Sequence, residues 1–364
     1  MGVAEKIKDI QDEMKRTQVN KATENHLGIL KAKLAKLRRE LIKEASKKGG
    51  GGGGFAIKRS GDATVVIIGP PSVGKSTLLN HITNAESRTA AYQFTTLTVV
   101  PGLMEYNGAK IQVLDLPGIM AGASEGRGRG KEVLSVARTA DLVLIMLDVF
   151  STKDNFVYNE LDAMGIRIDQ KAPDVVITMK QRGGVVVNST VPLSHLNQKT
   201  IESILAVYGT HNADVVIRED ISADQFIDVL VGNRHYVPSL LVLNKVDLVK
   251  KEYLGEIKKE LGHFIPISAE NNQNIEMMKK ALYDKLGIIR VYTKPRMGEA
   301  DLTEPLMIKS GATVEDVVHK LHVKGLVEGF KFASIWGKSA KFGGQKVGLK
   351  HILRDGDIIQ IVSK

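Results

Sequence analysis

Two hydrophobic patterns run along this chain, one typical of amphipathic helices and one of buried strands. Ile7, Ile10 and Met14 recur at helical spacing, and leucines recur at steps of three and four between positions 27 and 41. These stripes predict two helices that form a hairpin over residues 1–48. Because so small a hairpin buries little apolar surface, we expect it to dock on something else.

Further along, short continuous apolar runs predict buried strands. They lie at 64–68, 111–114, 142–147, 240–243 and 264–267. Such runs, separated by helical segments, are typical of a mostly parallel sheet with helices on both faces. We therefore expect a doubly wound α/β domain formed by residues 61–154 and 236–289.

The segment between the third and fourth of these strands is too long for a simple crossover, which needs on the order of 30 residues. Strand-like runs at 184–187 and 214–217 and helix-like runs at 199–208 and 223–232 lie inside it. Ser222 to Gln225 matches a capping box. The pattern predicts an inserted α/β subdomain at 155–235. Its histidines, His195 and His211, are isolated, and we interpret them as structural.

Glycines and a change of pattern mark the remaining boundaries. Six consecutive glycines, 49–54, predict a flexible linker at 49–60, because ordering such a run costs much backbone entropy. After Ile289, strand-like runs at 305–309, 332–336 and 357–362 surround a helix that Thr313 is placed to cap. This order predicts a compact α+β module at 290–364.

Residues 69–76 read Gly-Pro-Pro-Ser-Val-Gly-Lys-Ser between a buried strand and a helix, which is the P-loop pattern in its expected setting. Backbone N–H groups of such a loop surround phosphate oxygens, and the helix N-terminus adds partial positive charge. Lys75 is expected to neutralise the β- and γ-phosphates and Ser76 to ligate Mg²⁺. The alternative is an ordinary glycine-rich turn. The candidate nucleotide-binding residues here are Gly69, Pro70, Pro71, Ser72, Val73, Gly74, Lys75, Ser76 and Thr77.

Two further segments are candidates to sense the γ-phosphate. Asp115 and Gly118, in an Asp-Leu-Pro-Gly sequence, follow a core strand, where the carboxylate can hold Mg²⁺ through water and the amide can meet the phosphate. Phe94, Thr95 and Thr96 precede them, and a threonine hydroxyl there can complete the Mg²⁺ shell. The alternative for the threonines is the start of a strand.

The sequence Asn244, Lys245, Val246, Asp247 follows another core strand and indicates guanine. A carboxylate at 247 can accept hydrogen bonds from N1–H and N2–H₂ of guanine, whereas adenine leaves it unpaired. A backbone N–H of Ser268 or Ala269 can then meet the guanine carbonyl. Together these motifs favour GTP over ATP.

The composition of the chain predicts the cellular compartment of the protein and the class of its partner. The chain has no cysteine, no apolar run long enough to span a bilayer and no secretory signal, so we expect a cytoplasmic protein without membrane contact. Net charge is +6 over residues 1–48, −1 over 49–289 and +5 over 290–364. Basic termini suggest a polyanionic partner, and solvated lysine-rich faces are the alternative.

Aromatic residues in the C-terminal module lie among lysines. Phe332, Trp336 and Phe342 are interleaved with Lys331, Lys338 and Lys341. Such a mixture can stack on RNA bases and neutralise phosphates. We nevertheless expect these aromatics to form the core of the small sheet.

The order of the motifs resembles Obg-type GTPases, and essentially the whole chain resembles the developmentally regulated GTP-binding protein (DRG) family. The stretches that carry this resemblance are 20–23, 26–28, 34–41, the glycine run, 71–79, 90–97, 291–295 and 346–348. The resemblance implies a helical N-terminal domain, a G domain with a small α/β insert and a C-terminal β-grasp TGS domain. It also implies Mg²⁺ ligation by Ser76 and Thr96 and guanine contacts from Asn244, Lys245, Asp247, Ser268 and Ala269. With Asp115 as the third expected Mg²⁺ ligand, the expected catalytic residues are Lys75, Thr96 and Gly118.

One position departs from Ras-like enzymes. Ile119 occupies the place of a water-orienting glutamine, so we expect slow hydrolysis. Some Obg-like relatives use K⁺ to supply the missing charge, and Ser72 stands here where K⁺ users carry an asparagine. The glycine-rich loop 122–130 is expected to be the second switch, and Arg127 or Arg129 as an internal arginine finger is the minor alternative to a solvated loop.

The resulting expectation is a slow GTP/GDP switch that engages the ribosome or RNA through its basic termini, with a protein partner on the TGS domain left open. Two alternatives remain. One is a non-catalytic adaptor that retains GTP, and the other is an ATP-preferring relative that carries a TGS domain.

Overall fold

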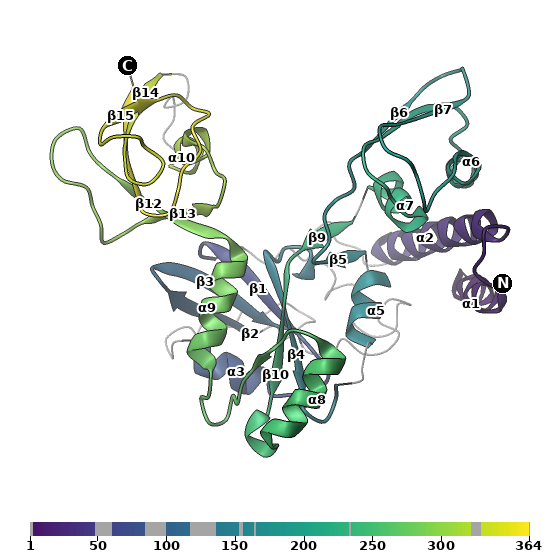
Figure 1. Cartoon of the computed structure of the whole chain (residues 1–364), viewed down its shortest axis with the longest axis horizontal. Coiled ribbons are helices and arrows are strands. Elements are labelled where there is room, and N and C mark those ends of the chain that lie inside the picture. Colours follow the sequence, from purple (N-terminus) through teal and green to yellow (C-terminus); the bar gives the residue numbers. More distant parts are fainter. Residues whose placement is uncertain are drawn as a thin grey trace. The chain divides into compact units, whose positions relative to one another are not determined.

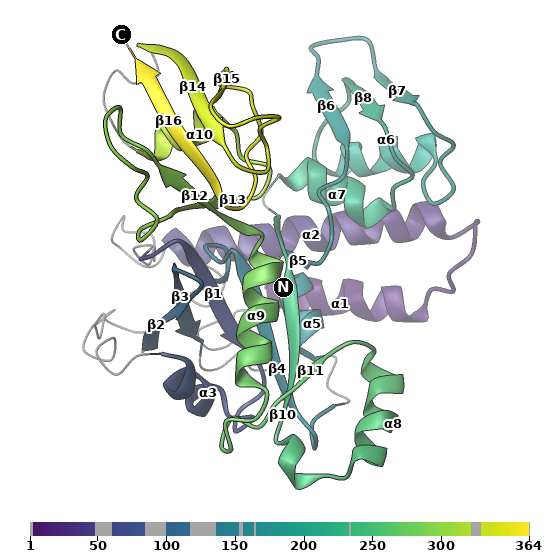
Figure 2. The same cartoon turned by 60° about the vertical axis from the view of Figure 1, so that its left-hand side comes forward.

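The structure is a computed structural model, and Figures 1 and 2 show its helices and strands. These elements divide into two compact units. The first unit comprises 1–57, 118–139 and 153–237, and the second comprises 58–117, 140–152 and 238–364. Within them the structure describes residues 3–47, 60–83, 100–116, 136–152, 156–163, 165–232, 234–321 and 329–363. Across these ranges, no helix has both the length and the apolar character needed to cross a membrane.

The second unit contains a six-stranded sheet in the order β11-β10-β4-β1-β3-β2. Its strands are β1 Ala63–Ile68, β2 Val100–Tyr106, β3 Ala109–Asp115, β4 Leu142–Asp148, β10 Ser239–Asn244 and β11 Ile265–Pro266. All neighbours are parallel except the edge strand β2, which pairs antiparallel with β3. The run predicted as a strand at 264–267 forms only the two-residue β11, because pairing with β10 is limited to Val242 and Leu243.

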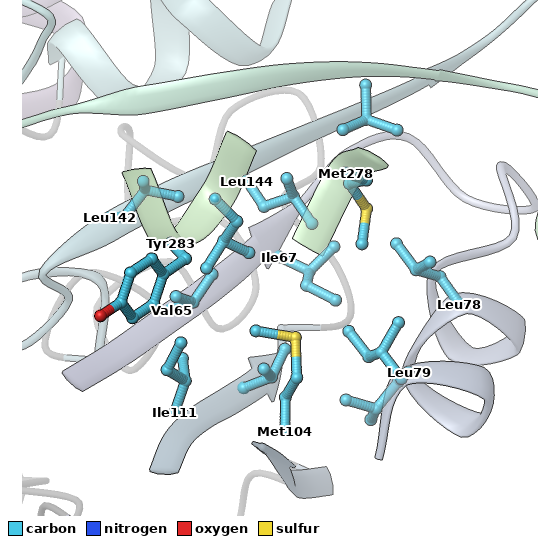
Figure 3. Close-up of a cluster of buried hydrophobic side chains, with 14 of the residues drawn as sticks. Val65, Ile67, Leu78, Leu79, Met104, Ile111, Leu142, Leu144, Met278 and Tyr283 are labelled. Atoms are coloured by element: carbon cyan, nitrogen blue, oxygen red, sulfur yellow. The ribbon is translucent and has the colours of Figure 1, made fainter. Parts of the chain in front are cut away.

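Helices α3 (Lys75–Ile82) and α9 (Ile275–Leu286) pack on one face of this sheet. Figure 3 shows their side chains meeting those of the strands, with Leu78 and Leu79 from α3 and Met278 from α9. Continuous apolar strands are explained by this burial, since each strand in the centre of a covered sheet is enclosed on both sides. Helix α8 (Lys251–Leu261) contributes Ile257 to a second buried cluster with Leu147 and Leu243.

Parallel pairing brings the carboxyl ends of these strands to one edge of the sheet. Asp115 at the end of β3 is in register with Ile67 of β1, and Asn244 at the end of β10 is in register with Asp148 of β4. Ligands of open α/β sheets bind at this edge. The edge is therefore where the candidate motifs meet.

The second unit ends in a five-stranded sheet in the order β13-β12-β16-β14-β15. The strands are β12 Ile288–Thr293, β13 Leu306–Lys309, β14 Phe330–Trp336, β15 Gln345–Val347 and β16 Asp357–Ser363. Helix α10 (Val314–Lys320) begins with a capping box formed by Thr313 and Asp316, as the sequence predicted. It packs Val317 and Val318 against Ala333 and Ile335.

The aromatics that we expected in the core of this module lie elsewhere. Phe332 and Trp336 alternate with Ala333 and Ile335 along β14, so they lie on the opposite face of the sheet and stay half-buried. Phe342 is 66% exposed. The prediction of an aromatic core was wrong because the strand's period of two places Ala333 and Ile335, and not the aromatics, on the helix-covered face.

The first unit begins with the predicted helical hairpin, α1 (Val3–Arg16) and α2 (Glu24–Lys47). Its turn is closed reciprocally: Thr23 N–H donates to Asn20 Oδ1 at 3.0 Å and Asn20 N–H donates to Thr23 Oγ1 at 3.1 Å. Ile7 and Leu30 are buried.

The insert supplies what the hairpin docks on. A three-stranded sheet in the order β6-β8-β7 carries helices α6 and α7. The bounds of these elements are β6 Val175–Met179, β7 Val185–Ser189, α6 Gln198–Val207, β8 Ala213–Ile217 and α7 Ala223–Val231. Ala32 of α2 lies in the same buried cluster as Ile201 and Ile204 of α6. The capping box from Ser222 to Gln225 is present as predicted.

The rest of this unit is α5 (Phe156–Ala163) and the parallel pair β5 (Ile166–Ile168) and β9 (His235–Val237). These short elements gave no clear sequence signal. The domain boundaries drawn from the sequence remain a prediction.

Candidate nucleotide site

The P-loop leaves β1 and enters α3 through two glycines that the structure requires. A Cβ on Gly69 would overlap the carbonyl oxygen of Met146. Gly74 has φ of +96° and faces the side-chain amide of Asn244, so both its backbone conformation and its surroundings exclude a side chain. The turn therefore holds its N–H groups at the start of α3, the arrangement that binds anions.

Lys75 folds back over this loop. Its Nζ donates to the carbonyl oxygens of Gly69 at 3.0 Å and Pro70 at 2.7 Å. Burial lowers the pKa of Lys75 from its ordinary value, and the Asp115 carboxylate offsets part of that shift. An ammonium group hydrogen-bonded to neutral carbonyls can exchange them for phosphate oxygens.

Ser76 and Asp115 meet beside the loop. Ser76 Oγ donates to Asp115 Oδ2 at 2.8 Å, although 39 positions separate them in the chain. The Asp115 side chain is buried, and its Oδ1 accepts no hydrogen bond from the described residues. A buried carboxylate oxygen without a donor costs free energy unless a cation or its hydration water satisfies it. A hydroxyl beside a carboxylate is an oxygen donor set that suits Mg²⁺.

Asn244 joins the P-loop to the loop after β11. Its Nδ2 donates to the Val73 carbonyl at 2.8 Å, and its Oδ1 accepts from the Ala269 N–H at 2.9 Å. The Asn244 side chain is thus a buried brace between two segments that are distant in sequence. The backbone N–H of Ala269, one of the two that the sequence predicted to contact the guanine carbonyl, donates instead to Asn244 Oδ1.

Lys245 makes a second connection. Its Nζ donates to the Ser72 carbonyl at 2.9 Å and pairs with Asp148 Oδ2 at 2.6 Å, and its backbone is left-handed with φ of 63°. Burial raises the pKa of Asp148, but hydrogen bonds from Lys245 and Ser151 outweigh it and hold the pKa below its ordinary value. Lys245 also lies 6.0 Å from the centre of the exposed Phe150 ring.

The remaining candidate residues lie at the same edge. Asp247, in the short 3₁₀ helix η3 (Val246–Leu248), exposes its side chain, and Ser268 is buried, where its Oγ accepts from Asn271 N–H at 3.2 Å. Asp148 and Phe150 were not predicted from the sequence as members of this site. A signal was available, because Asp148 ends the core strand β4 and Phe150 lies two residues beyond it, at the strand end where the recognised motifs also lie.

Seven of the residues singled out from the sequence lie outside the described ranges: Phe94, Thr95, Thr96, Gly118, Ile119, Arg127 and Arg129. The predicted switch loop 122–130 and nearly all of the predicted linker 49–60 lie outside them as well. Their roles remain predictions. The described residues bring together the P-loop, Asp115 and the Asn244 to Asp247 segment, which is the arrangement of a P-loop nucleotide-binding domain of the GTPase class.

Comparison with known proteins agrees with this class. Residues 64–180 match the family described as 50S ribosome-binding GTPase, 182–288 match its C-terminal region and 289–363 match the TGS domain. The fold predicted from the sequence, a P-loop GTPase domain followed by a C-terminal TGS domain, is confirmed.

The relatives extend over the full chain. The chain is 55% identical over 370 residues to an uncharacterised GTP-binding protein of Methanocaldococcus jannaschii, covering 100% of this chain and 94% of that one. It is 44% identical over 366 residues to human developmentally-regulated GTP-binding protein 2, covering 100% of both. A GTP-binding protein of Pyrococcus horikoshii of known structure aligns with a TM-score of 0.45 at 15% identity, over 83% of this chain and 100% of that one. The chain belongs to the developmentally regulated GTP-binding protein family.

Proposed function

We propose that this protein binds GTP with Mg²⁺ and hydrolyses it slowly to GDP and phosphate, as a nucleotide-dependent switch in the cytoplasm. The observation that carries the proposal is the connection of the phosphate loop to the guanine segment, in which Asn244 holds Val73 and Lys245 holds Ser72. The two ends of one nucleotide are thereby given fixed positions relative to each other.

In the proposed complex, Ser76 and Asp115 hold Mg²⁺ together with Thr96. When bound there, Mg²⁺ would supply positive charge that offsets the negative charge of the phosphates. Asp115 Oδ1, which has no hydrogen-bond donor within the described ranges, supports this assignment. Lys75 exchanges the carbonyls of Gly69 and Pro70 for phosphate oxygens, and the Gly118 amide meets the γ-phosphate.

Discrimination between bases tests the guanine assignment. Asp247 is proposed to accept from N1–H and N2–H₂ of guanine, and xanthine carries a carbonyl in place of that amino group. Asp247→Asn should weaken GTP binding by on the order of 10³-fold or more and favour xanthosine triphosphate, because a polar group that the bound base covers and leaves unpaired discriminates strongly. Equal competition of GTP by ATP in the unaltered protein would support the ATP-preferring alternative instead.

Slow turnover follows from Ile119, which cannot orient the attacking water. K⁺ is the proposed source of the missing charge, with Ser72 as the residue at its expected position. A single-turnover assay with Mg²⁺ in KCl and in NaCl measures both the rate of hydrolysis and its dependence on K⁺. Equal rates in the two salts would exclude K⁺ activation, and GTP retained without hydrolysis would establish the adaptor alternative.

The proposed partner is the ribosome or RNA, and one surface of the TGS domain supports it. On the face of its sheet away from α10, Lys294 Nζ lies 4.8 Å from the centre of the Trp336 ring and Lys346 Nζ lies 4.6 Å from that of Phe332. Aromatic rings beside ammonium groups can stack bases and neutralise phosphates. The matching family is also described as ribosome-binding. A protein partner on this domain is the second candidate.

Trp336 is the only tryptophan in the chain, so its fluorescence reports on this surface directly. Titration with single-stranded RNA should quench it, with affinity that falls as salt increases. Lys294→Ala with Lys346→Ala should weaken binding, whereas the exposed Lys350→Ala serves as control. Co-sedimentation with ribosomes under GTP, GDP and a non-hydrolysable analogue then tests the partner. Absence of binding at low salt in every nucleotide state would defeat it.

A further inference from the structure

A cavity of about 200 Å³ lies within the first unit and shares no lining residue with the P-loop. It opens between α2 and α7, which lie side by side in Figures 1 and 2. Its cationic lining residues are Lys31, Arg38, Arg39, Arg138, Arg167 and Arg234. Three carboxylates also line it: Asp162, Asp224 and Asp228.

All three carboxylates are engaged by cationic neighbours. Arg167 holds Asp228 through Nε at 2.5 Å and Nη2 at 2.8 Å, and its Nη1 lies 2.8 Å from Asp162. Arg234 Nε reaches Asp228 at 2.6 Å, and Lys31 Nζ reaches Asp224 at 2.5 Å. The Asp228 side chain is 3% exposed, so this network is fixed in the wall of the cavity.

The lining therefore has six cationic and three anionic side chains, a surplus of three positive charges around a small volume. One lining residue shows the effect of this environment: burial, and then the charge of Arg234, lower the pKa of Arg138 from its ordinary value. Like charges gathered in a part-buried space repel one another, and an anion among them relieves that repulsion.

The residue types indicate which anion fits. Five of the six cations are arginines, whose planar guanidinium groups match phosphate oxygens in bidentate geometry. The volume is below the 300–1,000 Å³ typical of sites for drug-sized ligands, which favours a compact group.

We propose that this cavity binds a phosphoryl group, presented either by a small phosphorylated molecule or by an RNA backbone. Arg39 of α2 and Arg138, which both line the cavity, contact the group. The Asp228 network holds the wall in place without itself binding the ligand.

Calorimetric titration of the full chain with inorganic phosphate tests this site, with GDP and Mg²⁺ present to occupy the P-loop. The expected result is one-to-one binding that weakens about tenfold in Arg39→Gln and in Arg138→Gln, since each loses a charge-assisted hydrogen bond. Lys33→Gln is the control, because Lys33 neighbours this face on α2 but is exposed and lies outside the lining. Circular dichroism and GDP affinity verify that each variant is folded.

Single-stranded RNA then distinguishes the two sources. If RNA displaces phosphate and Arg39→Gln weakens both, the site takes an RNA backbone phosphate. If phosphate binds but RNA does not displace it, the ligand is a small phosphorylated molecule. No binding at millimolar phosphate, or equal affinity in Arg39→Gln, Arg138→Gln and Lys33→Gln, overturns the proposal. The Trp336 titration is independent of this result, because it reports on a different domain.

Discussion

Asn244 donates a hydrogen bond from Nδ2 to the Val73 carbonyl oxygen at 2.8 Å, across 171 positions of the chain. The same side chain accepts from the Ala269 N–H. One buried amide thus sets the spacing between the loop that is proposed to hold phosphates and the segments that are proposed to hold guanine.

Removing this brace should cost both stability and affinity. Asn244→Ala leaves the Val73 carbonyl and the Ala269 N–H without their partner, which should lower the free energy of unfolding by about 1–3 kcal/mol. GDP affinity should fall as well, because the two loops lose their common support. Urea denaturation and GDP calorimetry measure the two effects. Asn271→Ala, at an exposed position, should change neither, and a similar loss in both variants would contradict the interpretation.

Nucleotide affinity should also depend on the protonation of Lys75. Burial places its pKa below the ordinary 10.5, and only the protonated amine attracts phosphate. Affinity should therefore be constant near neutral pH and fall as pH rises through this lowered pKa. Titrations of a fluorescent GDP analogue across an alkaline pH series measure this. Lys75→Arg should give a flat profile, since a guanidinium stays charged throughout. An equally flat profile in the unaltered protein would show that the amine remains charged.

The two aspartates of α7 should differ sharply in their contribution to stability. Asp228→Asn removes the charge that offsets two nearly buried guanidinium groups, those of Arg167 and Arg234, and should destabilise the protein by about 3–5 kcal/mol. Asp224→Asn removes an ion pair whose carboxylate is 56% exposed, and should cost about 0–1 kcal/mol. Chemical denaturation of both variants compares them under identical conditions. Equal losses would mean that the Asp228 network is more solvated than its geometry indicates.

The hairpin should depend on small side chains for its contact with α6. A Cβ on Gly28 would lie 2.8 Å from Thr200 Cγ2, and Ala32 is fully buried in the cluster with Ile201. Ala32→Leu should force α2 away from α6, because overpacking a filled interface typically costs about 1–3 kcal/mol. Hydrogen exchange at the amides of α6 should become faster. Lys33→Leu introduces the same side chain at an exposed neighbouring position. If the α6 amides also exchange faster in Lys33→Leu, a steric cause is excluded.

Much of this structure could be predicted from local sequence patterns. Apolar runs predicted β1, β3, β4 and β10, and the P-loop pattern predicted the turn into α3, because a buried strand and a phosphate-binding turn each impose requirements within a few residues. Capping boxes at Ser222 and Thr313 were readable for the same reason. The family was likewise indicated by motifs whose order along the chain is visible in the sequence.

Contacts between distant segments were decided only by the tertiary structure. The pairing of Lys245 with Asp148, the brace of Asn244 and the arginine-rich cavity each join residues that no local pattern connects. The aromatics of β14 show the same limit, since composition suggested a core and only the covering helix determined which face was buried. Periodicity defines the two faces of an element, but the partner that covers one of them is supplied by the fold.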